Sequence, residues 1–118
     1  MDPLIAQVRL MDFEIAASRR RVAQTRSMIA DFERLAAELD REVRAEEDRT
    51  GNHDPRHFAY STVAKAASLR RDNLMHSIGQ LRIQLGATHA ALEAALEKSR
   101  SATVSGQAPA MSHTGHAA

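Results

Sequence analysis

The sequence predicts an all-α fold, a long antiparallel two-helix coiled-coil hairpin followed by a disordered C-terminal tail. Apolar residues recur every 3.5 residues in two long tracts, which is the period of a helix that keeps one seam against a partner helix. No glycine or proline occurs between Pro3 and Gly51, whereas both residue types occur between the two tracts. The break lies near mid-chain, so each helix has the other as its expected partner.

The first helix is expected over residues 3–49. Asp2 can cap it, and Pro3 suits the first helical position because its missing N–H would be unpaired there anyway. The seam consists of residues spaced by seven together with a second row three residues further on, represented by Val8, Ile15, Val22, Ile29, Phe32, Leu39 and Val43. Ser18 and Thr25 are polar residues at seam positions, where polarity lowers stability and can fix register.

The turn is expected at residues 50–54, where Gly51 tolerates the left-handed conformation that often follows a helix. Asp54-Pro55 then repeats the pair Asp2-Pro3, so the second helix is expected over residues 55–99. A start one turn later, capped by Ser61 or Thr62, is the alternative. The second seam advances by alternating steps of four and three through Leu74, Ile78, Leu81, Leu85 and Leu92. Arg71 falls on its backward extension.

The hairpin is expected to form a single domain over residues 1–100. Residues 101–118 are small, polar and turn-prone and have no periodicity, which is typical of a disordered tail.

Composition and charge narrow the class of protein. The net charge of +1 gives no electrostatic basis for binding nucleic acid. Cysteine is absent, so thiol chemistry and cysteine metal sites are excluded. The N-terminus does not have the pattern of a secretory signal, and no apolar run approaches the roughly 18 residues of a membrane span. We therefore expect a cytoplasmic protein without direct membrane insertion.

Neither an enzyme nor a metal site is expected. His53 and His57 are separated by a turn–helix junction, and no third ligand is fixed near them, whereas zinc needs three or four converging ligands. The carboxylates near the end of the first helix could do acid–base work only in a pocket that shifts their pKa values, and a two-helix hairpin has none. We predict no catalytic residues and no cofactor.

The second helix carries an unusually uncharged stretch. Between Met75 and Leu92 the only formally charged residue is Arg82. Such a surface indicates a protein contact, although an alanine-rich helix can have the same composition without one.

The middle of the chain carries a more specific pattern than the heptads. It contains IADFER at residues 29–34, DPRHFAY at residues 54–60 and RRDNL at residues 70–74. With these motifs, residues 28–74 resemble the central part of the flagellar export protein FliJ family, and the resemblance extends over about two-thirds of the chain.

The resemblance implies a small cytoplasmic component of the bacterial flagellar type III export apparatus, peripheral at the inner membrane, with a stalk-like antiparallel coiled coil. Members associate with the hexameric export ATPase, contact the cytoplasmic domain of the export gate and help to hand over substrate–chaperone complexes. By matching the aromatic motif, the resemblance indicates the partner-binding residues Phe58, Tyr60, Val63, Ala67, Arg70 and Arg71.

Two departures from the family pattern bear on this expectation. Ser61 stands where the similar group usually has proline, and the chain ends soon after Arg100, where members commonly continue with a longer charged helix. If that extension contributes to ATPase docking, the contact here is altered or missing. The alternative function is a structural, self-associating coiled coil or an adaptor unrelated to export, in which the seams pair between chains as a homo-oligomer.

Overall fold

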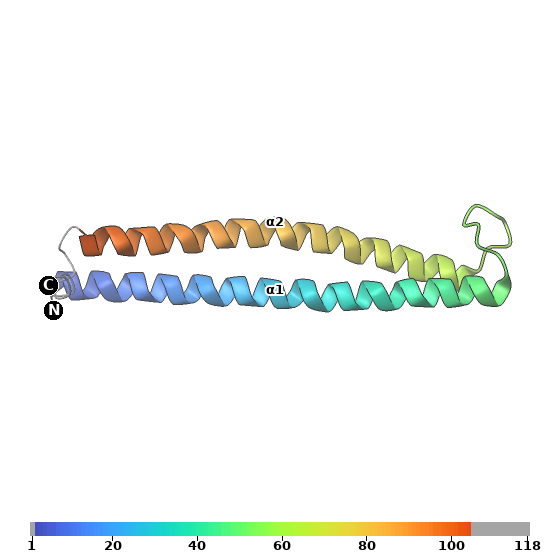
Figure 1. The fold of residues 1–118 in the computed structure, drawn as a ribbon, viewed down its shortest axis with the longest axis horizontal. Coiled ribbons are helices and arrows are strands. Elements are labelled where there is room, and N and C mark those ends of the chain that lie inside the picture. Colours follow the sequence, from blue (N-terminus) through green and yellow to red (C-terminus); the bar gives the residue numbers. More distant parts are fainter. Residues whose placement is uncertain (1, 105–118) are drawn as a thin grey trace, which may run out of the picture. The chain divides into compact units, whose positions relative to one another are not determined.

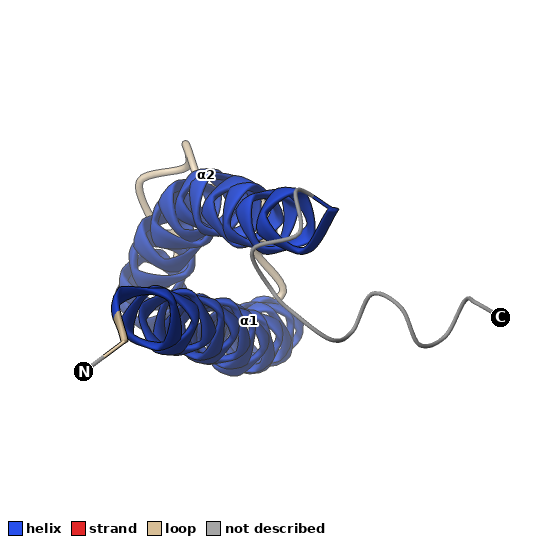
Figure 2. Cartoon of the chain, turned by 90° about the vertical axis from the view of Figure 1, so that its left-hand side faces the viewer, coloured by secondary structure: helices blue, strands red, loops and turns tan. Residues whose placement is uncertain are grey.

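The computed structural model describes residues 2–104. It contains two α-helices, α1 (Pro3–Thr50) and α2 (Thr62–Val104), joined by residues 51–61 (Figure 1). Figure 2 shows helix and loop only in this part of the chain, and no strand. The predicted all-α helical hairpin is confirmed.

The start and end of α1 follow the local signals in the sequence. The Asp2 carboxylate accepts a hydrogen bond from the Leu4 N–H at 2.9 Å, which satisfies one of the unpaired donors of the first turn. At the other end, Gly51 has a φ of 76° and donates its N–H to the Glu47 carbonyl at 2.8 Å. Glycine adopts this left-handed conformation without the penalty that a Cβ atom brings.

The start of α2 differs from the predicted residue 55. The Asp54 carboxylate accepts from the Arg56 N–H at 3.0 Å, but the chain then makes two successive turns, with His57 N–H donating to the Asp54 carbonyl and Tyr60 N–H to the His57 carbonyl. Ser61 is the cap, since its hydroxyl accepts from the Ala64 N–H at 3.2 Å. The alternative start at the Ser61–Thr62 junction is therefore correct, and the turn is longer than residues 50–54.

The end of α2 also differs from the prediction. The helix continues to Val104 rather than ending at residue 99. In its last turns Arg100 pairs with Glu97 at 2.7 Å, and the Thr103 hydroxyl donates to the Ser99 carbonyl at 3.1 Å. Residues 101–104 of the predicted tail are thus helical, and the remainder of that predicted tail, residues 105–118, lies outside the described residues.

The chain divides into two compact units. One, the turn unit, consists of residues 25–84 and holds the second half of α1, the turn and the first half of α2. The other, the terminal unit, pairs the first half of α1 with the second half of α2, and its described part is residues 2–24 and 85–104.

The turn unit has the larger apolar core. Val43, Tyr60, Ala64 and Ala67 form one buried cluster, against which Leu39 packs. Ile78 is fully buried, which is worth about 1.5–3 kcal/mol relative to exposure. In the terminal unit Met11 and Val22 are buried together with the polar Ser18.

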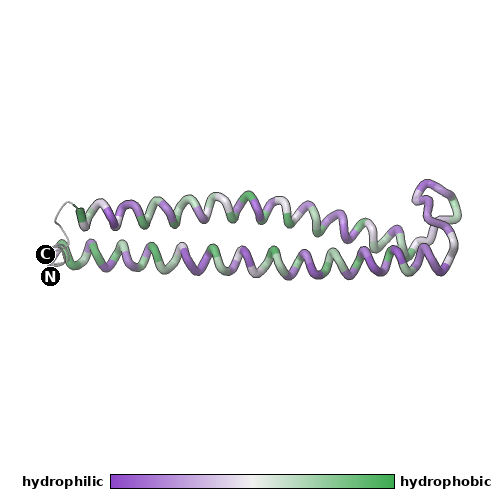
Figure 3. Tube along the Cα trace, in the orientation of Figure 1, coloured by the Kyte–Doolittle hydropathy of each residue, from purple (hydrophilic) through white to green (hydrophobic). Residues whose placement is uncertain are grey.

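Burial along the helices follows the heptad period. Hydrophobic and hydrophilic residues alternate along both helices in Figure 3. All twelve residues of the two predicted seams are buried or half-buried: Val8, Ile15, Val22, Ile29, Phe32, Leu39, Val43, Leu74, Ile78, Leu81, Leu85 and Leu92. The seam positions therefore face inward.

Candidate partner-binding surfaces

The turn is held in shape by hydrogen bonds from its own side chains. The Asn52 side-chain oxygen accepts from the Asp54 N–H, and the His57 Nδ1 accepts from the Ala59 N–H, both at 3.0 Å. Asn and Asp side chains favour such short local bonds in turns. The residues that follow Gly51 thus have a defined conformation despite lying outside the helices.

Two hydrogen bonds tie the end of the turn to the end of α1. The Tyr60 hydroxyl donates to the Glu47 carboxylate at 2.6 Å, and the Ser61 hydroxyl donates to the Glu46 carboxylate at 2.9 Å. Arg49 also donates to Glu46, at 3.0 Å from its Nε. The Tyr60 and Ser61 bonds fix where α2 begins relative to α1 in the turn unit.

These hydrogen bonds shift the pKa values of Glu46 and Tyr60. The Arg49 and Ser61 hydrogen bonds lower the pKa of Glu46 to about 2, because they stabilise its charged form. The bond to Glu47 raises the pKa of Tyr60 above its ordinary value, because only the protonated phenol can donate. Neither residue lies in an enclosed pocket. The shift of Glu46 comes first from Arg49 within α1 and then from Ser61, whereas the shift of Tyr60 comes from the contact with Glu47 that joins the turn to α1.

Phe58 is the most exposed large apolar side chain of the turn. It is 96% exposed, and its ring stacks on that of His57 with centroids 4.6 Å apart. A phenylalanine held outward by an ordered loop is unusual without a partner, since aromatic side chains are enriched at protein interfaces. Val63, in the first turn of α2, is also exposed.

The predicted partner-binding residues differ in their exposure. Tyr60 and Ala67 are only 8% and 1% exposed and belong to the core of the turn unit. They cannot form an outer contact in this conformation. Phe58, Val63 and Arg70 are exposed and can do so.

Arg71 has a structural partner within the hairpin. Its guanidinium donates to Asp40 on α1 at 2.7 Å and also pairs with the neighbouring Asp72 at 3.1 Å. These carboxylates, Asp40 first, raise the pKa of Arg71 above its already high ordinary value. The predicted seam position of Arg71 is thus occupied by an ion pair between the helices, and Arg82 makes a second one with Glu33 at 2.5 Å.

A shallow groove lies on one side of the turn unit, with a volume of about 360 Å³. Its lining combines apolar and charged side chains from both helices: Leu35, Glu38, Leu39, Glu42, Arg70, Asn73 and Leu74. The groove extends beyond the predicted seams, because Leu35 lines it and lies beside the α1 seam rather than in it. The sequence signal for such a surface is the second apolar row beside the seam, which also contains Met28, seven residues before Leu35.

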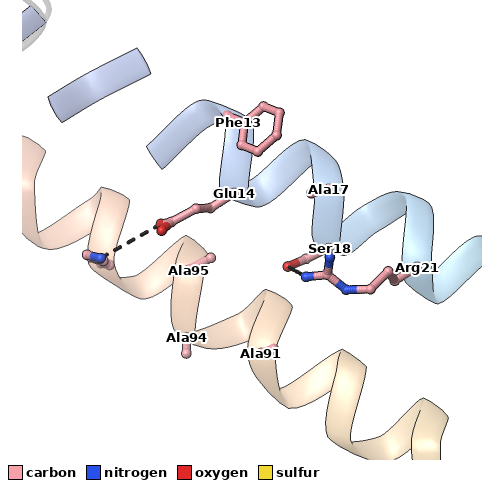
Figure 4. Close-up of a pocket in the computed structure, with 9 residues that line it drawn as sticks. Phe13, Glu14, Ala17, Ser18, Arg21, Ala91, Ala94 and Ala95 are labelled. Atoms are coloured by element: carbon pink, nitrogen blue, oxygen red, sulfur yellow. Dashed lines mark hydrogen bonds and ion pairs between the residues drawn. The ribbon is translucent and has the colours of Figure 1, made fainter. Parts of the chain in front are cut away.

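A second hollow, of about 400 Å³, lies within the terminal unit (Figure 4). The space is left open on the α2 side because Ala91, Ala94 and Ala95 provide only methyl groups there. The Ser18 hydroxyl accepts from Arg21 at 3.2 Å, and Glu14 pairs with Lys98 at 3.7 Å. The polar seam residue Ser18 therefore coincides with a loosely packed stretch of this unit.

The uncharged stretch of α2 is largely exposed. Within the turn unit, Met75 and Ile83 are exposed, while Arg82 reaches Glu33 on α1. The predicted protein contact on this stretch stays a prediction.

Residues 2–104 contain neither a metal-binding cluster nor a membrane-spanning helix. No group of three or more His, Cys, Asp or Glu side chains in this range could hold a metal ion. His53 lies 3.4 Å from Glu47 and 3.6 Å from Asp48, but His57 bonds within the turn instead. None of the described helices is long and apolar enough to cross a membrane.

Comparisons with protein-family models, with curated proteins and with solved structures found no significant match for this chain.

Proposed function

We propose that the chain is a non-enzymatic component of the bacterial flagellar type III export apparatus, as the resemblance to the FliJ family implies. It binds the export ATPase and the cytoplasmic domain of the export gate and assists the hand-over of chaperones and substrates. The observation that carries the proposal is Phe58, 96% exposed within the DPRHFAY motif that is the most specific part of the resemblance.

The gate contact is assigned to the outward-facing residues of the turn and the start of α2. Phe58 supplies an aromatic anchor, Val63 adds apolar surface, and Arg70 adds positive charge. Exposed aromatic and arginine side chains often contribute most of the binding free energy at interfaces. Tyr60 and Ala67 act indirectly, by fixing the turn from the inside.

The ATPase contact is assigned to the terminal unit. A helical pair offers no pocket for nucleotide chemistry, so any influence on ATP hydrolysis comes from binding one conformation of the ATPase more tightly than another. The protein acts in the cytoplasm, peripheral at the inner-membrane export apparatus.

Binding measurements with purified partners test the proposal. Calorimetry should detect binding of the full chain to the cognate export ATPase and to the cytoplasmic domain of the gate. Phe58→Ala should weaken gate binding by at least about tenfold, the size of an interface hot spot, with unchanged helicity by circular dichroism.

Phe13→Ala is the matched control, because Phe13 is also an exposed phenylalanine but lies on α1 in the terminal unit. It should leave gate binding unchanged. Absence of binding to both purified partners would refute the proposed function, and equal losses for the two variants would refute the assignment of Phe58.

A further inference from the structure

The two sides of the turn unit are unlike. On one side the ion pairs Arg71–Asp40 and Arg82–Glu33 link the helices. Leu35 and Glu42 lie on the other side of the α1 seam, since 3.6 residues per turn place them about 140° or more from Asp40. That second side has no such link and instead carries the groove lined by Leu35, Leu39 and Leu74.

The groove leaves apolar surface in water. Leu35 is 46% exposed, and Met28, seven residues earlier on the same stripe of α1, is 45% exposed. Both therefore lie beside a seam that is already filled by Ala36 and Leu39. An apolar stripe this wide is typical of a helix that packs against more than one neighbour.

The rims of the groove carry side chains of opposite charge. Glu38 and Glu42 stand on the α1 rim and Arg70 on the α2 rim. Across residues 2–104 these three side chains take part in no ion pair. The same surface thus offers both members of a charge pair.

A two-fold axis parallel to the helices makes this surface complementary to itself. Such an axis places α1 of one copy against α2 of the other at the same height along the groove. Arg70 of each copy then faces Glu38 and Glu42 of its partner, and the apolar floors of the two grooves meet. A self-complementary contact of this kind closes on itself as a dimer.

We propose that the occupant of this groove is a second copy of the chain. The turn units of two protomers pair through their grooves into a four-helix arrangement in which Leu35, Leu39 and Leu74 of both copies form a shared core. Neighbouring helices in this arrangement are antiparallel, as in common four-helix bundles. The dimer contact leaves Phe58 and Val63 outside it but uses Arg70, which is also assigned to the proposed gate contact. Phe58→Ala therefore tests the gate contact without touching the dimer contact.

Sedimentation equilibrium of the full chain tests the dimer. The wild type should show a monomer–dimer equilibrium at micromolar concentrations. Leu35→Arg should raise the dimer dissociation constant by at least about tenfold, because it places a charge in the apolar floor. Leu69→Arg, on an exposed leucine of α2 that does not line the groove, should leave it unchanged.

A charge exchange separates specific pairing from general aggregation. Two variants are compared: the single variant Arg70→Glu and the double variant that combines Glu38→Arg with Glu42→Arg. Each alone should self-associate more weakly than the wild type, because like charges then face each other across the dimer contact. An equimolar mixture of the two variants should restore dimers, since both contacts are again between opposite charges. Arg44→Glu, on the side of α1 opposite Leu35, is the control with the same change of charge.

A wild-type chain that remains monomeric throughout the micromolar range would overturn the proposal and would leave the groove to a different occupant. A mixture of charge-reversed chains that fails to recover dimers would overturn the proposed two-fold arrangement. Neither result would alter the calorimetric test of Phe58, so the two proposals fail independently.

Discussion

At the scale of single residues, Tyr60 is both a structural contact and a built-in probe. It is the chain's one tyrosine, and there is no tryptophan, so its phenol can be titrated by ultraviolet absorbance without interference. The family resemblance implies that this aromatic residue lies on a partner-binding surface. The structure buries it, because α2 begins at Thr62 rather than at Pro55 and Tyr60, just before the Ser61 cap, joins the cluster of Val43, Ala64 and Ala67.

The titration of Tyr60 should have a midpoint above its ordinary pKa of about 10. The bond to Glu47 raises the folded-state pKa, so its contribution to stability is fully present below pH 10 and is lost as the pH rises through the folded-state value. Glu47→Gln should move the midpoint back toward 10, whereas Glu38→Gln, on the exposed face of α1, should not. A wild-type midpoint at 10, or an equal effect of both variants, would contradict the assigned hydrogen bond.

At the scale of elements, the pairs Asp2-Pro3 and Asp54-Pro55 show that the same local sequence can begin a helix at one site and a turn at another. Both aspartates accept a hydrogen bond from the N–H two residues later, at 2.9 and 3.0 Å. Only the first opens a helix. The second opens a turn, because burial of Tyr60 and its bond to Glu47 require the chain to reach back to α1 before α2 begins. Tertiary contacts override helix propensity here, and no local pattern encodes them.

The seams, in contrast, were predictable because they do not depend on any particular tertiary contact. A period of 3.5 residues is a property of the whole helix, so it identifies the inward face without knowledge of any single contact. The groove was harder to foresee, because Leu35 and Arg70 come together only once the register between the helices is known. The heptads thus predict the core, while the surfaces beside it depend on the pairing of two distant segments.

The polar seam position at Thr25 gives a prediction for element stability. Thr25 is 4% exposed within a row of apolar seam residues. Thr25→Val keeps the branched shape and replaces a buried hydroxyl with a methyl group, so it should raise the free energy of unfolding by about 1 kcal/mol. Urea denaturation followed by circular dichroism measures the change.

The control for this substitution is Thr62→Val, the same replacement at the exposed first residue of α2, which should change stability by less than about 0.5 kcal/mol. A destabilised Thr25→Val chain would show that the hydroxyl fixes the register of the seam rather than merely being tolerated there.

At the scale of the whole molecule, the two units differ in the number of buried side chains and in the ion pairs that connect their helix segments. The turn unit has the Val43–Tyr60–Ala64–Ala67 cluster, and the hydrogen-bonded Arg71–Asp40 and Arg82–Glu33 pairs connect its helices. The terminal unit has fewer buried side chains and the longer Glu14–Lys98 pair at 3.7 Å. Under the proposed function, the turn unit, assigned to the gate, is therefore the more tightly packed of the two. The terminal unit, assigned to the ATPase, is the one whose helix segments can change conformation more easily.

Hydrogen exchange should report this difference directly. Amides of residues 25–50 and 62–84 should exchange more slowly than those of residues 3–24 and 85–104, because few buried contacts oppose local opening in the terminal unit. Ala95→Leu adds a side chain to the hollow of Figure 4. It should slow exchange in the terminal unit by about fivefold, the effect of about 1 kcal/mol of added burial, and leave the turn unit unchanged. Ala90→Leu, at an exposed position of the same helix, should have no such effect. Equal protection of both units in the wild type would show that the hairpin opens as one cooperative structure.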